Sequence, residues 1–219
     1  MITLGIDAST YVGSVAVIRD GVVISEREPA MRGEHEERLM PAVADALADA
    51  AVAPNEIDRI ACGAGPGSFT SLRIAGAIAK GLALTARAPL YPVPSLLLIV
   101  AGANPGLAPG RYVAALDAMR GEMFAQLFVV TESSIVAESG TTIVPRADLD
   151  AVARSHAARA VGPAEEIVAA PHARGVALLG HHVSWPEAAD LATWEPDYGR
   201  LAEAQVRWEA AHGRALVPR

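Results

Sequence analysis

A glycine-rich stretch at residues 63–70, GAGPGSFT, is the part of this sequence that most resembles a phosphate-binding loop. A P-loop needs the pattern G-x-x-x-x-G-K-[ST], in which backbone N–H groups and a lysine surround the phosphates. That string is absent, because the only lysine, Lys80, lies well downstream. The dinucleotide pattern G-x-G-x-x-G is absent as well, since the glycines alternate with other residues. Ser68 and Thr70 stand where capping oxygens belong, so the stretch is either an anion site at a helix N-terminus or a capped strand-to-helix turn.

Two aspartates that follow apolar strands, Asp7 and Asp117, are of the type that orients a hydrated Mg²⁺ beneath nucleotide phosphates. Ser9 and Thr10 offer hydroxyls in the first turn, whereas the matching turn 119–121 has none. A two-sided phosphate clamp is therefore incomplete. The alternative is that each aspartate caps its own turn through an Asx hydrogen bond.

Metal-binding and nucleophilic patterns are weak in this sequence. No H-E-x-x-H or H-x-x-x-H pair occurs, and no G-x-S-x-G string is present. The single cysteine, Cys62, cannot form a thiolate site and fits a reducing compartment. His181 and His182 are adjacent, so a strand would point them to opposite faces. We therefore expect no metal, no cofactor and no catalytic residue.

The elements that must position these residues alternate between strands and helices, which predicts an α/β fold. Strands are predicted at 2–6, 12–18, 22–28, 57–62, 90–93, 112–116, 121–130, 134–142, 160–162 and 176–180. Helices are predicted at 34–51, 71–86, 95–101, 147–155 and 185–193. In the first of these helices, Pro41 either introduces a kink or marks the true first turn.

The segments 2–18 and 112–130 share one layout: an apolar strand, then Asp-Ala, a short turn and a second apolar strand. This similarity predicts an internal duplication, with two lobes that each begin with a strand, an aspartate and a hairpin. The loop 104–110 is the best boundary, so the predicted lobes are 1–103 and 104–215. Residues 216–219, LVPR, resemble the remnant of a cleaved tag.

Composition narrows the functional class. The 219 residues are 52% hydrophobic, 5% aromatic and carry a net charge of −7. With no basic stripe and few stacking platforms, direct binding to a nucleic-acid backbone is not expected. No apolar run approaches 18 residues and no leader pattern is visible, so a cytoplasmic protein is expected.

The helix predicted at 71–86 has small residues on one side. Ala75, Ala79 and Ala83 recur every four residues, and Gly76 flanks them. Such a row leaves a shallow groove that allows another helix to approach closely. The groove is interpreted either as a subunit interface or as a packing surface within the chain.

Several motifs together resemble those of the bacterial TsaB (YeaZ) family. They are GIDAST at 5–10, GEHEERLMPAV at 33–43, GAGPGSFTSLRIA at 63–75, GLAL at 81–84, LDAMRGEMF at 116–124 and EPDYGR at 195–200. The resemblance is dense over residues 1–130 and looser beyond. It implies two duplicated RNase H-like lobes of the sugar kinase, Hsp70 and actin (ASKHA) superfamily.

The resemblance also implies a function. The family is a non-catalytic scaffold that pairs with the transferase TsaD, with TsaE as the ATPase, in making threonylcarbamoyladenosine beside the anticodon of tRNAs. It also forms homodimers through the face that meets TsaD. The residues do not match the metal-binding histidine pair of TsaD, because Leu39 stands four residues after His35. The alternatives are a small ATP-binding ASKHA enzyme, a glycopeptidase-like hydrolase, or a homodimeric module independent of tRNA.

The family's partner-facing helices correspond here to 34–51 and 71–86. The residues expected at the partner interface are His35, Arg38, Leu39, Val43, Leu72, Arg73, Gly76 and Ala79. The residues expected as a vestigial phosphate site are Asp7, Ser9, Thr10 and Asp117.

Overall fold

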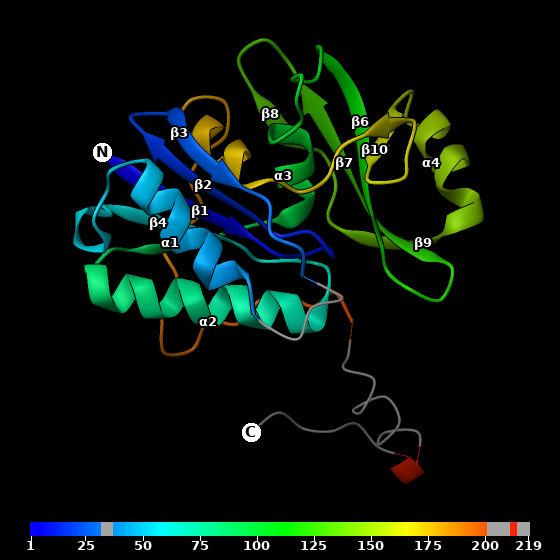
Figure 1. The fold of residues 1–219 in the computed structure, drawn as a ribbon. Helices are drawn as coiled ribbons and strands as arrows, with labels where there is room; N and C mark the ends of the chain where they lie inside the picture. The colour runs from blue at the N-terminus through cyan, green and yellow to red at the C-terminus, as the bar shows by residue number, and fades with distance from the viewer. Residues whose placement is uncertain (32–36, 201–210, 214–219) are drawn as a thin grey trace.

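Two mixed β-sheets form the frame of the computed structural model, which describes residues 1–31, 37–200 and 211–213 (Figure 1). The first sheet consists, in spatial order, of β3 (Val22–Arg27), β2 (Ser14–Arg19), β1 (Ile2–Asp7), β4 (Arg59–Gly63) and β5 (Leu90–Val93). The second consists of β11 (Ile167–Val168), β10 (Arg159–Gly162), β6 (Gly110–Asp117), β7 (Glu122–Val130) and β8 (Ile135–Ala137). The strand β9 (Thr142–Pro145) pairs with the first half of β7.

The two sheets have the same topology. In the first, β1 is antiparallel to β2 and parallel to β4. In the second, β6 is antiparallel to β7 and parallel to β10. The equivalent strands β1 and β6 end at Asp7 and Asp117, which confirms the predicted duplication and the predicted fold of two RNase H-like lobes.

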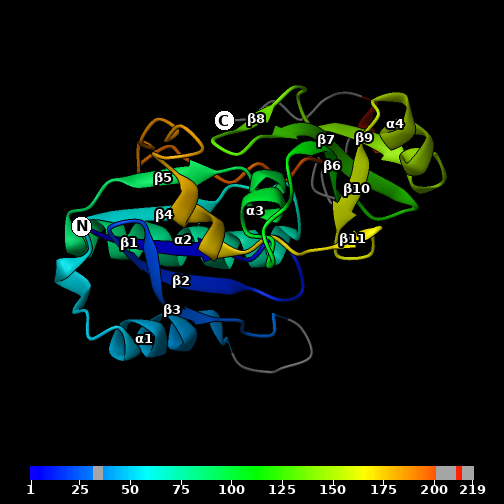
Figure 2. The same cartoon turned by 90° about the horizontal axis from the view of Figure 1, so that it is seen from above.

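Helices separate and cover the two sheets. The outer side of the first sheet is covered by α1 (Leu39–Asp49) and α2 (Phe69–Ala86). The space between the sheets holds α3 (Ser95–Ala101) and the 3-10 helix η3 (Ala173–Leu178), as Figures 1 and 2 show. The far side of the second sheet is covered by α4 (Leu149–Ser155). Short 3-10 turns are η1 (Pro54–Glu56) and η2 (Arg146–Asp148).

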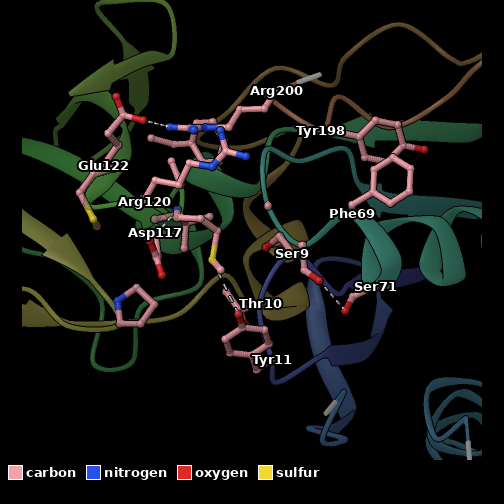
Figure 3. Close-up of a pocket in the computed structure, with 18 of the residues that line it drawn as sticks. Ser9, Thr10, Tyr11, Phe69, Ser71, Asp117, Arg120, Glu122, Tyr198 and Arg200 are labelled. Carbon is pink, nitrogen blue, oxygen red and sulfur yellow. Dashed lines mark hydrogen bonds and ion pairs between the residues drawn. The ribbon is translucent and has the colours of Figure 1, made fainter. Parts of the chain in front are cut away.

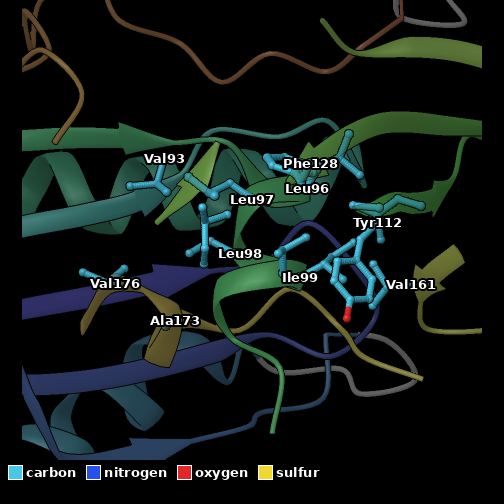
Figure 4. Close-up of a cluster of buried hydrophobic side chains, with 14 of the residues drawn as sticks. Val93, Leu96, Leu97, Leu98, Ile99, Tyr112, Phe128, Val161, Ala173 and Val176 are labelled. Carbon is cyan, nitrogen blue, oxygen red and sulfur yellow. The ribbon is translucent and has the colours of Figure 1, made fainter. Parts of the chain in front are cut away.

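The helix α3 joins the two lobes through a shared core. Its residues from Ser95 to Val100 are all buried, as expected of a helix that is apolar on every side. They pack with Val93 of the first sheet and with Tyr112 and Phe128 of the second (Figure 4). The two lobes therefore share one buried core at this helix.

Some predicted elements are wrong in type or extent. The predicted strand 176–180 lies largely in η3, because a short buried apolar run does not distinguish strand from helix. The predicted strand 134–142 is divided between β8 and β9. The predicted helix 185–193 is absent from the described structure.

The start of α1 also differs from the prediction. The helix begins at Leu39 and not at residue 34, which places Pro41 in its first turn, where a proline is tolerated. Glu37 caps this start, because its carboxylate accepts a hydrogen bond from the backbone N–H of Met40 at 3.1 Å. Residues 32–36 lie outside the described residues.

The C-terminal strap, defined here as residues 181–200, returns from the second lobe to the first. The backbone N–H of Ala189 donates to the carbonyl of Leu90 at 2.7 Å, so the strap covers the exposed edge of β5. The second sheet lies within the predicted lobe 104–215, but this strap packs on the predicted lobe 1–103. In the described residues, no helix has the length and apolar character needed to cross a membrane.

Candidate functional site

A cavity of about 1190 Å³ lies between the two lobes (Figure 3). The first lobe contributes the turn after β1 and the first turn of α2, and the second lobe contributes the β6–β7 hairpin. The strap adds Tyr198 and Arg200 to the wall. This is the location at which a nucleotide would be expected if the two aspartates acted on phosphates.

Asp7 does not line this cavity. Its side chain is 0% exposed and accepts three hydrogen bonds from serines. Oδ1 accepts from the backbone N–H and the hydroxyl of Ser9, at 2.9 and 2.7 Å, and Oδ2 accepts from the hydroxyl of Ser95 at 2.7 Å. Burial raises the pKa of the Asp7 carboxyl above its usual value, against the opposing effect of these hydrogen bonds. The assignment of Asp7 to a vestigial phosphate site stays a prediction, and in this structure its carboxylate is buried and bonded within the chain.

Backbone N–H groups of the glycine-rich loop donate hydrogen bonds to other parts of the same chain. The backbone N–H of Ala64 donates to the carbonyl of Val93 at 2.8 Å, and that of Ser68 donates to the carbonyl of Ser9 at 2.8 Å. The N–H of Gly65 donates to the hydroxyl of Ser95 at 3.1 Å. In a P-loop such donors surround the phosphates. Here these three are used internally, so the loop is a structural turn into α2.

Two of the loop glycines are required by close contacts. A Cβ atom at Gly63 would lie 1.9 Å from Asp7 Oδ2, and one at Gly65 would lie 1.9 Å from the backbone oxygen of Asp197 in the strap. Gly65 also has a φ of +90°, which disfavours other residues. The glycines therefore allow the β1 end, the α2 start and the strap to meet at one point.

The other expected phosphate-site residues do reach the cavity wall. Ser9, Thr10 and Asp117 all line it. The hydroxyl of Thr10 donates to the carbonyl of Val12 at 2.8 Å, and Asp117 Oδ1 accepts from the N–H of Met119 at 2.7 Å. These are turn-stabilising interactions, so the Asx alternative describes Asp117.

Four of the charged side chains in the cavity wall form two ion pairs. Arg146 pairs with Glu165, and Arg200 pairs with Glu122. Much of the remaining wall is apolar, with contributions from methionines and aromatic rings. Among the described residues no group of three or more histidine, cysteine or acidic side chains is arranged to hold a metal ion.

Most of the residues expected at a partner interface are buried. Leu39, Val43, Leu72 and Ala79 are each 0% exposed and pack within the chain. Gly76 faces the strap, because a Cβ there would lie 3.4 Å from Pro196. These five expectations are wrong as to which side of each helix faces outward. The physical reason is that the small residues of α2 bring the helix close to its own sheet and strap.

Two of the expected interface residues are on the surface. Arg38 precedes α1 and Arg73 lies on α2, and both are exposed. The Arg73 guanidinium lies 4.7 Å from the centre of the Phe69 ring, and its Nε donates to the hydroxyl of Tyr198 at 3.3 Å. His35 lies outside the described residues.

The sides of α1 and α2 that do face outward are rich in small and apolar residues. We define the outer helical face as Met40, Ala44, Ala48, Ala77, Gly81 and Leu84. Leu84 is 68% exposed and Met40 is 41% exposed. No atom outside its own helix lies within 4 Å of the position where Gly81 would carry a Cβ. These positions are exposed, whereas the alanine row Ala75, Ala79 and Ala83 is buried.

Sequence reasoning missed two features of the site. Ser95 binds Asp7 from 88 residues away, and no local pattern connects the two. Tyr198 and Arg200 belong to the EPDYGR motif, which was noted without a structural role.

Comparison with known proteins relates this chain to a tRNA-modification family. Residues 28–194 match the family model described as TsaD: tRNA N6-adenosine threonylcarbamoyltransferase. The tRNA threonylcarbamoyladenosine biosynthesis protein TsaB of Bacillus subtilis is 30% identical over 229 residues, covering 95% of this chain and 98% of that protein. The protein of the same name from Escherichia coli is 40% identical over 121 residues, covering 55% of this chain and 52% of that protein. A tRNA N6-adenosine threonylcarbamoyltransferase of Pyrobaculum islandicum is 31% identical over 106 residues, covering 42% of this chain and 32% of that protein.

Solved structures share the fold over nearly the whole chain. YeaZ from Pseudomonas aeruginosa aligns with a TM-score of 0.71 and 25% identity, covering 90% of this chain and 99% of that chain. A second solved structure aligns with a TM-score of 0.73 and 25% identity, covering 91% of this chain and 99% of that chain. It is described as an uncharacterized protein with similarity to peptidase YEAZ from Pseudomonas aeruginosa.

Proposed function

This chain belongs to the TsaB (YeaZ) family, and from that premise we propose that it is a non-catalytic subunit of a threonylcarbamoyl transferase complex. Its relatives are named as threonylcarbamoyladenosine biosynthesis proteins, which supports a role in making this modified nucleoside of tRNA. In the proposal the chain pairs with the transferase TsaD, TsaE supplies the ATPase, and the reacting groups are held by TsaD.

The observation that carries the non-catalytic assignment is the internal use of the phosphate-binding features. Asp7 is fully buried and bonded to Ser9 and Ser95. An aspartate that orients a hydrated metal ion has to reach the ligand. Here the Asp7 carboxylate instead joins the turn after β1 to α3. This is the role expected in a scaffold, where the aspartate stabilises the fold and binds no ligand.

The outer helical face supports the proposed pairing. The chain is similar to the transferase itself, so two related subunits can associate face to face with near two-fold symmetry. Small residues such as Ala77 and Gly81 allow helices to approach closely, and the exposed Leu84 supplies apolar area to bury. The same face is proposed for the homodimer, so the homodimer and the TsaD complex exclude each other.

In this proposal tRNA is bound by the complex and not by this subunit alone. The net charge of −7 opposes direct contact with a phosphate backbone. Because TsaD and TsaE carry the chemistry, this chain contributes by positioning TsaD.

A reconstitution tests the proposal. Cognate TsaD, TsaE, threonylcarbamoyl-adenylate and unmodified tRNA are incubated with and without this chain, and the modified nucleoside is quantified by mass spectrometry. We expect modification only when the chain is present, and unchanged modification when Asp117→Ala replaces the wild type. Equal modification without the chain would contradict the scaffold role. ATP turnover by the chain alone, lost in Asp117→Ala, would instead support an ATP-binding enzyme.

A further inference from the structure

The tip of the strap, Tyr198–Arg200, contacts both lobes within three consecutive residues. The Tyr198 ring lies 4.4 Å from the Phe69 ring, centre to centre, and its hydroxyl accepts a hydrogen bond from Arg73. Both of these partners belong to α2 in the first lobe. Two residues later, Arg200 pairs with Glu122 at the start of β7 in the second lobe (Figure 3).

Gly199, which lies between Tyr198 and Arg200 in the sequence, is in close contact with both lobes. A Cβ atom at Gly199 would lie 2.5 Å from the Phe124 ring of the second lobe and 2.8 Å from Pro66 of the first. Gly199 also has a φ of +68°, which favours glycine. The backbone therefore passes closely between the two lobes, beside the cavity wall that Tyr198 and Arg200 line.

The strap is firmly held on the first lobe before it reaches this point. The N–H of Asp197 donates to the carbonyl of Ala64 at 2.7 Å, and the carboxylate of Asp197 accepts from the N–H of Gly199 at 2.8 Å. By contrast, the contact between Tyr11 and Met119 across the cavity is a weak hydroxyl–sulfur interaction at 3.9 Å. The tip of the strap is thus bonded to the first lobe at Asp197, and it contacts the second lobe through Gly199 on the Phe124 ring and through the Arg200–Glu122 ion pair.

We propose that Tyr198–Arg200 is a latch that holds the lobes closed over the cavity, and that separation of Arg200 from Glu122 opens it around α3. The side chains of Arg200 and Glu122 are 26% and 40% exposed, so water and salt can compete for the pair. A contact of this kind is reversible, unlike the buried core that α3 shares with both lobes. The inference concerns the chain alone and does not depend on the proposed function.

Distance measurements across the cavity test the latch. Nitroxide labels are placed through Thr70→Cys in the first lobe and Ala164→Cys in the second, because both residues are exposed and line the cavity from opposite lobes. The native Cys62 is 0% exposed and stays unlabelled. Pulsed electron spin resonance then gives the distribution of distances between the labels in the full chain.

We expect one narrow distribution for the labelled protein and an added longer distance in both Arg200→Ala and Glu122→Gln. Arg159→Ala is the matched control, because it removes an exposed ion pair with Glu166 away from the strap. It should leave the distribution unchanged. In 1 M salt the unmutated latch should show the longer distance as well.

A chemical measurement checks the same opening without spin labels. Ser71→Cys places a thiol in the cavity wall at a position that is 5% exposed. Its reaction with a bulky maleimide should be about two- to fivefold faster when Glu122→Gln is added, because a partly exposed ion pair restrains opening by a factor of about that size. Distance distributions and reaction rates that coincide in Glu122→Gln and the unmutated latch would overturn the proposal, since this isosteric variant removes the charge of the pair and keeps the side-chain volume.

Discussion

The hydroxyl of Ser95 donates a hydrogen bond to Asp7 Oδ2 at 2.7 Å, and so joins the end of β1 to the first residue of α3. The same hydroxyl accepts a hydrogen bond from the N–H of Gly65. Three segments that are far apart in the sequence therefore meet at one buried carboxylate. This arrangement gives the aspartate at the end of β1 a structural role.

Removing this carboxylate should cost more stability than removing its counterpart in the second lobe. Asp7→Ala leaves the donors of Ser9 and Ser95 buried without an acceptor, and we expect a loss of about 3–5 kcal/mol. Asp117→Ala removes one exposed turn interaction and should cost less than about 1 kcal/mol. Urea unfolding of both variants measures the difference, and equal losses would contradict the structural role assigned to Asp7.

Acid should weaken the fold through His172. This side chain is nearly buried, and its Nδ1 accepts hydrogen bonds from the backbone N–H and the Nε of Arg174, both at 3.0 Å. Burial, and then the charge of Arg174, lower the pKa of His172 below the unfolded value of about 6.5, against the opposing effect of Glu26 and Glu28. The unfolded chain therefore binds the proton more readily, and stability is lost as the pH falls below about 6.5 towards the folded pKa.

Unfolding free energies at pH 7.5 and pH 5.5 measure this effect. His172→Asn should remove most of the loss between the two values, whereas His156→Asn, at an exposed position, should keep it. If the His172→Asn and unsubstituted proteins lose the same free energy, the pH dependence arises elsewhere.

Two glycine substitutions should change the free energy of unfolding in opposite directions. Gly63→Ala places a Cβ atom 1.9 Å from the Asp7 carboxylate, and we expect a loss of more than about 2 kcal/mol. Gly81→Ala lies inside α2 where no atom outside the helix is within 4 Å, and it should add about 0.5–1 kcal/mol. Thermal unfolding distinguishes them, and destabilisation by Gly81→Ala would show that a close contact there has been missed.

The sequence predicts the strands of the two sheets better than it predicts long-range contacts and which side of each helix is exposed. The apolar strands, the hairpins and the repeated strand-then-aspartate pattern give both lobes, because period and turn residues are local signals. The meeting of Asp7 with Ser95 is not predictable in this way, since it depends on the packing of α3 between the sheets. The segment 185–193 is predicted as a helix, but its backbone is bonded along the chain only in one turn at 190–194, and the N–H of Ala189 donates to the carbonyl of Leu90 in β5.

The alanine row of α2 shows a second limit of sequence reasoning. Small residues at a four-residue spacing allow close approach, but the pattern does not say what approaches. In the structure Ala75, Ala79 and Ala83 are buried against the chain's own sheet, and Trp194 of the strap lies beside Gly76. The outward positions of the same helix are equally small, so composition alone did not separate the two sides.

Two alanines on α2 should therefore respond differently to a bulky charge. Ala79→Arg buries a guanidinium in the core between α2 and the first sheet and should cost more than about 4 kcal/mol, or prevent folding. Ala77→Arg is exposed and should change stability by no more than about 0.5 kcal/mol. Circular dichroism and urea unfolding make the comparison. A folded Ala79→Arg protein of normal stability would show that residue 79 is exposed, which contradicts its burial in the structure.

The most direct test of the central proposal is the affinity of this chain for its cognate TsaD, measured by calorimetry. We expect a one-to-one complex that is weakened at least about tenfold by Ala77→Arg, a loss of about 1.4 kcal/mol. Ala151→Arg, an exposed change on α4 in the other lobe, should leave the affinity unchanged. Absence of any complex, or equal affinities for Ala77→Arg and the unsubstituted chain, would contradict the assignment of the outer helical face.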